Sequence, residues 1–296
     1  MTDTLKLTLL DDHCVIDMCS EVTERAALEI ESAFEKLFSY YKYERAVFRV
    51  NSPGGLLSAL RHILEYVENW RATGVKIETQ VTFCAASAAA VLVSFGEIGT
   101  RTAHRHSSML YHHSRIGGTA SVITASGANY LASLLKSTDH GLVNHLVSHI
   151  ARGLGGPILF ASQGEMRCKL LATQGATIAH KLELNADVSS LRWLKPTANM
   201  FRELGKKGSL DLYRRHLARR MDADTSMDLR EAYALCLIDC VHGVPELCKS
   251  PGAMLTNQID EVLASSTPEK RKSSNQCQPI LLADVEDQNS AEAEAF

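Results

Sequence analysis

The sequence predicts an α/β protein whose sheet consists largely of parallel strands joined by helical crossovers. Short apolar runs that suit strands alternate with amphipathic stretches that suit helices from residue 14 to residue 113. Such alternation is typical of right-handed crossover units. The chain has 296 residues, of which 45% are hydrophobic, so it can bury one large core.

The first predicted elements are two strands, a helix and a third strand. Residues 4–10 and 14–19 show the short apolar pattern of strands. Residues 21–38 carry apolar side chains at the three- and four-residue spacing of an amphipathic helix, with Ser20 as the expected N-cap. Residues 46–50 form another apolar run, which we expect to be the next strand.

The following elements lead to a run of small residues. Residues 56–71 are again amphipathic, and Gly74 is expected to end this helix. Residues 75–81 are expected to be a strand. The run Ala-Ala-Ser-Ala-Ala-Ala at 85–90 then opens an apolar segment that ends at Gly96. We expect a tight turn and a buried helix here.

The second half of the chain is less regular. After a loop, residues 109–111 are expected to be a strand that ends at His112. A long helical pattern covers 121–150, and residues 153–208 contain mixed short elements with enough apolar side chains to be ordered. Residues 264–296 are polar and poor in aromatic side chains, so we expect a disordered tail.

Composition argues against several classes of function. The formal net charge of −3 argues against a nucleic-acid-binding surface. The eight cysteines include no C-x-x-C pair, so we expect no metal site and instead free thiols in a reducing cytosol. The longest apolar run, at 85–95, is too short to span a bilayer, and the N-terminus lacks a secretory signal pattern. We therefore expect a cytoplasmic protein with no nucleic-acid or membrane partner.

Ser87 stands where a strand is expected to turn into a helix. A serine hydroxyl becomes a good nucleophile only when a base accepts its proton and fixed dipoles receive the charge that develops on the substrate oxygen. The first N–H groups of a helix have no partner within the helix, so they can supply such dipoles. On this segment alone, a serine packed at the start of a helix is the simpler interpretation.

Three motifs together change that interpretation. They are Asn51-Ser-Pro-Gly-Gly55, Ala85-Ala-Ser87 and Met109-Leu-Tyr-His112, in this order. The set resembles the proteolytic subunit of the Clp protease and its relatives. The resemblance implies the ClpP/crotonase-type spiral of ββα units, a fold shared with the enoyl-CoA hydratase (crotonase) superfamily. It also implies that 121–150 is a long handle-like helix through which subunit rings stack.

The resemblance implies roles for individual residues. Ser87 would be the nucleophile, His112 the base, and Asp224 the carboxylate that orients the imidazole. The backbone N–H groups of Gly55 and Ala88 would form the oxyanion hole. The alternatives are His113 for the base, Asp222 or Asp228 for the carboxylate, and Cys84 for the nucleophile. The Met-x-x-His pattern favours the first histidine, and the cysteine is expected to be a core thiol.

The resemblance also divides the chain. Residues 1–263 would form the catalytic domain, with an insertion at 153–208, because in the family the acidic residue follows the histidine much sooner. The similarity resumes at Asp224, and the family pattern implies a Leu-Ile-Asp strand at 237–239. The polar tail would be the C-terminal extension.

The implied activity is that of a serine-type endopeptidase that cleaves unfolded polypeptides or peptides through an acyl-enzyme, with no metal or organic cofactor. The implied assembly is a homo-oligomeric ring fed by an AAA+ unfoldase. The chain lacks the phosphate-binding pattern G-x-x-x-x-G-K-[ST], so any ATP use would belong to that partner. One departure is Phe83, where the family usually has glycine. A crotonase-type acyl-CoA enzyme and a ring subunit with a disabled site are therefore alternatives.

Overall fold

The computed structural model describes residues 5–115, 125–155, 196–197, 199–200, 203, 211–223 and 225–247. Most of the expected insertion at 153–208, the expected tail at 264–296 and Asp224 lie outside the described residues. The strands are β1 (Leu5–Leu9), β2 (Cys14–Met18), β3 (Arg45–Ser52), β4 (Lys76–Ala86), β5 (Thr102–His104), β6 (Ser108–Leu110), β7 (Ser226–Met227) and β8 (Cys240–His242). The helices are α1 (Glu24–Phe34), the π-helical η1 (Glu35–Tyr40), α2 (Leu57–Ala72), α3 (Ala88–Ser94), α4 (Ala125–Gly155), α7 (Asp211–Asp222), α8 (Leu229–Ala234) and the 3₁₀ turn η3 (Pro245–Leu247).

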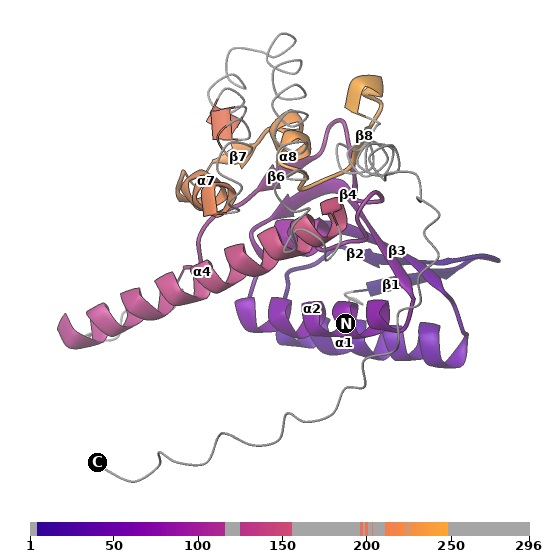
Figure 1. The fold of residues 1–296 in the computed structure, drawn as a ribbon. Coiled ribbons are helices and arrows are strands. Elements are labelled where there is room, and N and C mark those ends of the chain that lie inside the picture. Colours follow the sequence, from indigo (N-terminus) through magenta and orange to yellow (C-terminus); the bar gives the residue numbers. More distant parts are fainter. Residues whose placement is uncertain are drawn as a thin grey trace, which may run out of the picture.

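The described strands form one sheet in the order β1-β2-β3-β4-β5-β8, with β6 beside β4 and β7 beside β6 (Figure 1). Neighbouring strands from β2 to β8 run parallel, as do β4 and β6. The two antiparallel pairs are β1 with β2 and β6 with β7. Parallel neighbours need crossover connections, and α1, α2 and α3 provide the first three. The predicted α/β class with a largely parallel sheet is confirmed.

Helices α1 and α2 lie together against one face of the sheet (Figure 1). Burial alternates along β3, as expected for a strand with one face in the core. Phe48 on its buried face packs against Phe34 of α1, with ring centroids 6.4 Å apart. Phe38 of η1 packs against Trp70 of α2, with ring centroids 5.2 Å apart. These aromatic contacts join both helices to the sheet in one core.

The start of α1 differs from the expectation. The N-cap is Thr23, not Ser20, and the Thr23 hydroxyl accepts a hydrogen bond from the Ala26 N–H at 3.1 Å. The reason is a contact made by Val22, which forms a parallel bridge with Gly55. An extended residue at 22 prevents the helix from beginning earlier.

β4 is longer than predicted and changes its partner along its length. It pairs with β5 at Gln80 and Val81, and with β6 from Cys84 to Ala86. Between these two regions the register against β3 shifts, which is a bulge in β4. Phe83 lies in this bulge and is 69% exposed. Cys84 is only partly buried, so its assignment as a core thiol is wrong.

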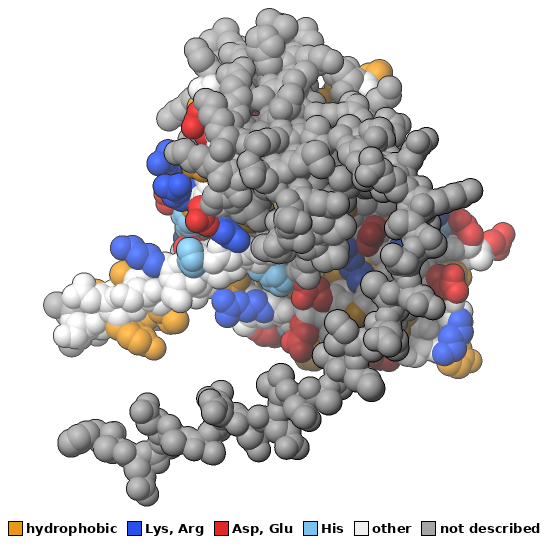
Figure 2. All heavy atoms as spheres, in the orientation of Figure 1, with side chains coloured by type: hydrophobic (Ala, Val, Ile, Leu, Met, Phe, Trp, Pro, Cys, Tyr) orange, Lys and Arg blue, Asp and Glu red, His pale blue; other side chains and the backbone are white. Residues whose placement is uncertain are grey.

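The long helix predicted at 121–150 is confirmed as α4. Its second half packs on the body through a stripe of buried side chains at Asp139, Val143, Leu146, Val147 and Ile150. Its first half projects from the body (Figure 1), and hydrophobic side chains there are uncovered (Figure 2). Within the described residues, no helix has both the length and the apolar character needed to cross a bilayer.

The strand expected at 237–239 is displaced. The chain leaves α8 through a tight turn, in which Cys236 has a φ of 55° and the Leu237 N–H donates to the Ala232 carbonyl at 2.9 Å. β8 therefore begins only at Cys240.

Candidate active site

Ser87 lies at the point where β4 ends and α3 begins. Its φ of 55° and ψ of −124° place a side chain with a Cβ in a conformation that few residues other than glycine adopt. Strain of this kind, about 1–3 kcal/mol, persists where the surrounding structure enforces it and is concentrated at functional sites. Here the Ser87 N–H donates to the Leu110 carbonyl at 2.7 Å, and its carbonyl accepts from the Ala90 and Val91 N–H groups.

The Pro-Gly-Gly turn packs directly against Ser87. A Cβ at Gly54 would lie 2.4 Å from the Ala86 carbonyl oxygen and 2.6 Å from the Ser87 Cβ. A Cβ at Gly55 would lie 2.2 Å from the Val22 carbonyl oxygen. Both glycines also have positive φ, of 94° and 155°. The sequence Gly-Gly is therefore needed for this turn to approach the strand-to-helix junction.

The backbone N–H groups of Gly55 and Ala88 have no acceptor among the hydrogen bonds of the described residues. The Ala88 N–H is free because this residue opens α3, and the first N–H groups of a helix lack intrahelical partners. The neighbouring Gly54 N–H, in contrast, donates to the Ser52 hydroxyl at 3.1 Å. The two N–H groups named from the sequence for an oxyanion hole are thus available for a ligand oxygen.

The segment that leads from β6 to His112 is fixed to α3. Ala86 and Leu110 are partners in the β4–β6 pairing, and Tyr111 is fully buried, with its hydroxyl 2.6 Å from the Ser94 hydroxyl and 3.2 Å from the Ala90 carbonyl oxygen. Burial raises the pKa of Tyr111 well above its ordinary value, so the phenol stays a donor. His112 follows directly, two residues after the Leu110 carbonyl that accepts the Ser87 N–H.

One ring nitrogen of His112 is already engaged. Its Nδ1 lies 2.6 Å from the backbone carbonyl oxygen of His113. Because a carbonyl only accepts, Nδ1 must carry the proton, which leaves Nε2 as the acceptor in the neutral ring. In the described part of the chain, no hydrogen bond joins the Ser87 hydroxyl to His112.

His113 has a different environment. Its Nδ1 lies 3.1 Å from an Asp139 carboxylate oxygen, and its Nε2 lies 2.9 Å from Asp222 and 3.1 Å from the Ala218 carbonyl oxygen. Asp139 belongs to α4, and the other two residues belong to α7. Nε2 of His113 therefore faces acceptors from α7, whereas Nδ1 lies near the Asp139 carboxylate without forming a hydrogen bond to it. The ring thus lies between the two helices.

The structure describes two of the three candidate carboxylates. Asp224 lies outside the described residues. Asp222 contacts His113, as described above, and its side chain is 70% exposed. Asp228 is the N-cap of α8 and accepts the Arg230 N–H at 2.7 Å. Asp139, which sequence reasoning did not single out, is 9% exposed and lies beside His113. A lone aspartate in a helical pattern gives no signal that could have found it.

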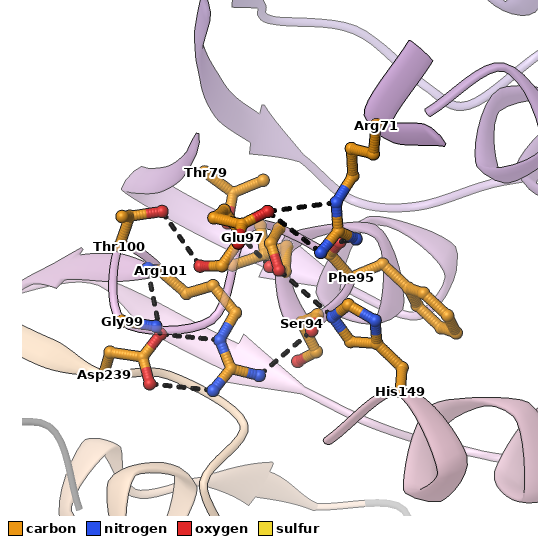
Figure 3. A network of polar contacts seen from close by, with 12 residues as sticks. Arg71, Thr79, Ser94, Phe95, Glu97, Gly99, Thr100, Arg101, His149 and Asp239 are labelled. Carbon is orange, nitrogen blue, oxygen red and sulfur yellow. Dashed lines mark hydrogen bonds and ion pairs between the residues drawn. The ribbon is translucent and has the colours of Figure 1, made fainter. Parts of the chain in front are cut away.

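The far end of α3 is held by side chains from four segments (Figure 3). The acceptors are the carbonyls of Val93, Ser94, Phe95 and Gly96, which receive Thr79 Oγ1, Arg101 Nη1, Arg71 Nη1 and His149 Nε2 at 2.7, 3.1, 3.0 and 3.1 Å. These donors satisfy carbonyls that the end of a helix leaves without partners, and the cations suit its dipole. The helix that begins at Ser87 is therefore anchored at its other end.

Arg101 is itself completely buried, as is its partner Asp239. The guanidinium makes two hydrogen bonds to the carboxylate, at 2.7 and 2.8 Å, and Asp239 also accepts the Gly99 N–H at 2.8 Å (Figure 3). Sequence reasoning missed this pair because arginine and aspartate are rarely fully buried.

The chain matches the Clp protease family model over residues 3–174, more than half of its length. It belongs to the Clp protease family. A search of curated proteins finds no match. Membership of the Clp protease family implies serine peptidase activity in general, peptide substrates and an oligomeric assembly. The matched residues include the Pro-Gly-Gly turn, Ser87, His112 and His113.

Proposed function

We propose that this Clp-family protein is a serine endopeptidase with Ser87 as its nucleophile. The observation that carries the proposal is the Ser87 turn, where a strained serine is held beside two N–H groups that have no acceptor among the described residues. A strained serine with nothing to bind would bring no advantage that offsets its conformational energy. The unused N–H groups of Gly55 and Ala88 support an oxyanion hole that consists of backbone groups only.

The proposed reaction runs in two halves. The Ser87 Oγ attacks the scissile carbonyl carbon while its proton passes to Nε2 of His112, and the negative oxygen that forms is stabilised by the Gly55 and Ala88 N–H groups. His112 then protonates the leaving amine, which leaves an acyl ester on Ser87. Water attacks this ester with His112 again as base, and the serine is regenerated. Asp224 remains the proposed third member of the triad, on the resemblance alone. Since the Nδ1–H of His112 is donated to the His113 carbonyl oxygen, its proposed role is to stabilise the charged form of the imidazole.

We also propose the wider setting that the family implies. The subunits would assemble into a homo-oligomeric ring, and an AAA+ unfoldase would deliver unfolded polypeptide, without a metal or organic cofactor in this chain. A cytoplasmic location is supported by the five cysteines in the described residues, all of which are free. Burial raises the pKa of Cys236 to about 12 and of Cys14 to about 11, so these two thiols stay protonated and are poor nucleophiles.

The test is labelling of the full-length chain with a serine-reactive fluorophosphonate, followed by intact-mass measurement. Wild type should take up one adduct that maps to Ser87, and Ser87→Ala should take up none and lose peptidase turnover by on the order of 10⁴- to 10⁶-fold. Cys84→Ala is the matched control, since this residue lies three positions earlier on β4, and it should label like wild type. Wild type that stays unlabelled would contradict the proposal. Tight binding of acyl-CoA would then favour the crotonase alternative, and assembly without either activity would favour a disabled subunit.

A further inference from the structure

We infer that Asp139 supports the base His112 through a single peptide group, that between His113 and Ser114. The carbonyl oxygen of this peptide accepts the His112 Nδ1–H at 2.6 Å. The N–H of the same peptide donates to an Asp139 carboxylate oxygen at 2.8 Å. Carboxylate, amide and imidazole therefore form one continuous chain of hydrogen bonds. This inference rests on the proposed roles of Ser87 and His112.

Asp139 is held in place by its burial and by the contacts of both its carboxylate oxygens. It lies on the packed half of α4 and is 9% exposed. One carboxylate oxygen accepts the Ser114 N–H, and the other lies 3.1 Å from Nδ1 of His113. Two consecutive residues after His112 are thus fixed by one side chain from a helix that is distant in sequence. Asp139 therefore determines the orientation of the peptide between His113 and Ser114.

The charge of Asp139 adds to this orienting effect. A hydrogen bond from an N–H to a carboxylate is stronger than one to a neutral acceptor. Hydrogen bonds in a chain polarise one another, by about 10–30% per bond, so the carbonyl oxygen of residue 113 becomes a better acceptor. That oxygen holds the His112 proton on Nδ1, which keeps Nε2 free to take the proton of Ser87. The negative charge also stabilises the imidazolium that forms when His112 accepts this proton.

Other charged groups near this peptide group define the controls. A cavity of about 490 Å³ adjoins His113 and Asp139 and lies between α4 and α7. Its other charged or titratable wall residues are Lys136 and His140 from α4, and Arg214, Arg215 and Asp222 from α7. Arg214 is paired with Asp211 at 2.6 Å. Asp222 contacts the ring of His113 and not the peptide that follows it. It is therefore a nearby carboxylate that does not belong to the hydrogen-bond chain, which makes it the control.

The experiment measures fluorophosphonate labelling of the full-length chain as a rate and as a final amplitude, across pH 5 to 9. Asp139→Asn is the main variant, because an amide oxygen can still accept the Ser114 N–H while the charge is lost. We expect the limiting rate to fall by about 10- to 100-fold, the range found for groups that orient metal-binding histidines. Asp222→Asn should match wild type in the limiting rate.

Each result decides the inference. A slower rate at full amplitude supports it, whereas a reduced amplitude with an unchanged rate would show that Asp139 has only a structural role. An Asp139→Asn rate equal to that of wild type would overturn the relay alone and leave the proposed function intact, especially if Asp224→Asn abolished labelling. Wild type that fails to label would overturn the relay together with the proposed function.

Discussion

At the scale of single residues, the site depends on positions where a side chain cannot be accommodated. Gly54 combines a φ of 94° with direct contact to the backbone and Cβ of the Ser87 turn. Gly74 has nearly the same φ, 99°, but nothing lies within 4 Å of the position where its Cβ would be. Gly54 and Gly74 therefore have similar backbone conformations and unequal surroundings.

This pair gives a residue-scale prediction. Gly74→Ala should lower the free energy of unfolding by about 1–2 kcal/mol, the penalty for an alanine in a left-handed conformation. Gly54→Ala should lower it by about 2 kcal/mol more, because overpacking is added to the same strain, and it should abolish fluorophosphonate labelling. Urea unfolding and intact-mass labelling measure the two effects. Equal losses of stability in both variants would show that the Gly54 contact has no energetic consequence.

At the scale of elements, α3 is short and gains its position from its ends. It has seven residues, too few for an isolated helix to be stable in water. At one end it is fixed by the bond from Ser87 to β6, and at the other by the side chains that bind its last carbonyls. Arg101 reaches this end only because Asp239, from the segment before β8, neutralises it inside the core.

The element-scale prediction concerns that buried pair. Asp239→Asn leaves the guanidinium of Arg101 charged, fully buried and without a counter-ion, so it should lower the free energy of unfolding by about 3–5 kcal/mol. Glu29→Gln, which breaks the exposed pair with Arg25 on α1, should lower it by less than about 1 kcal/mol. Denaturant unfolding of both variants at one protein concentration makes the comparison. A small loss for Asp239→Asn would mean that Arg101 finds another partner or water.

At the scale of the whole molecule, the outstanding feature is the projecting half of α4 (Figure 1). Tyr130 and Leu134 are 67% and 49% exposed, and they lie four residues apart on the same face of this helix. An apolar face held away from the body is unfavourable in water unless another surface covers it. The oligomeric assembly implied by the family gives such a cover.

The whole-molecule prediction follows. Tyr130→Ser combined with Leu134→Ser should convert the assembly to a smaller species, because the α4 contact loses most of its apolar area. Leu28→Ser, which changes a leucine of α1 that is 58% exposed, should leave the mass unchanged. Sedimentation velocity at micromolar concentration measures both. If the double variant kept the mass of wild type, the subunits would have to associate through another surface.

Much of the fold could be predicted from the sequence, since local patterns determine it. The alternating strands and helices from residue 14 to residue 113 follow from apolar periodicity. The structure confirms them in order, but it adds strand β5 (Thr102–His104) in the stretch expected to be a loop. The boundaries could not be predicted as well. The start of α1 depends on a bridge from Val22 to Gly55, and the bulge at Phe83 depends on β4 changing partners. Both are contacts between segments far apart in the sequence.

The sequence by itself determined the family, the Pro-Gly-Gly turn and the choice of Ser87 and His112 as candidates, because short motifs carry that information. Only the tertiary structure decided that Arg101 and Asp239 are paired in the core. It alone also showed that His113 lies near two carboxylates and that one of them, Asp139, binds the peptide between His113 and Ser114. The physical reason is that a charge gains its role from its partner and from its burial. Those depend on which distant segments the fold brings together.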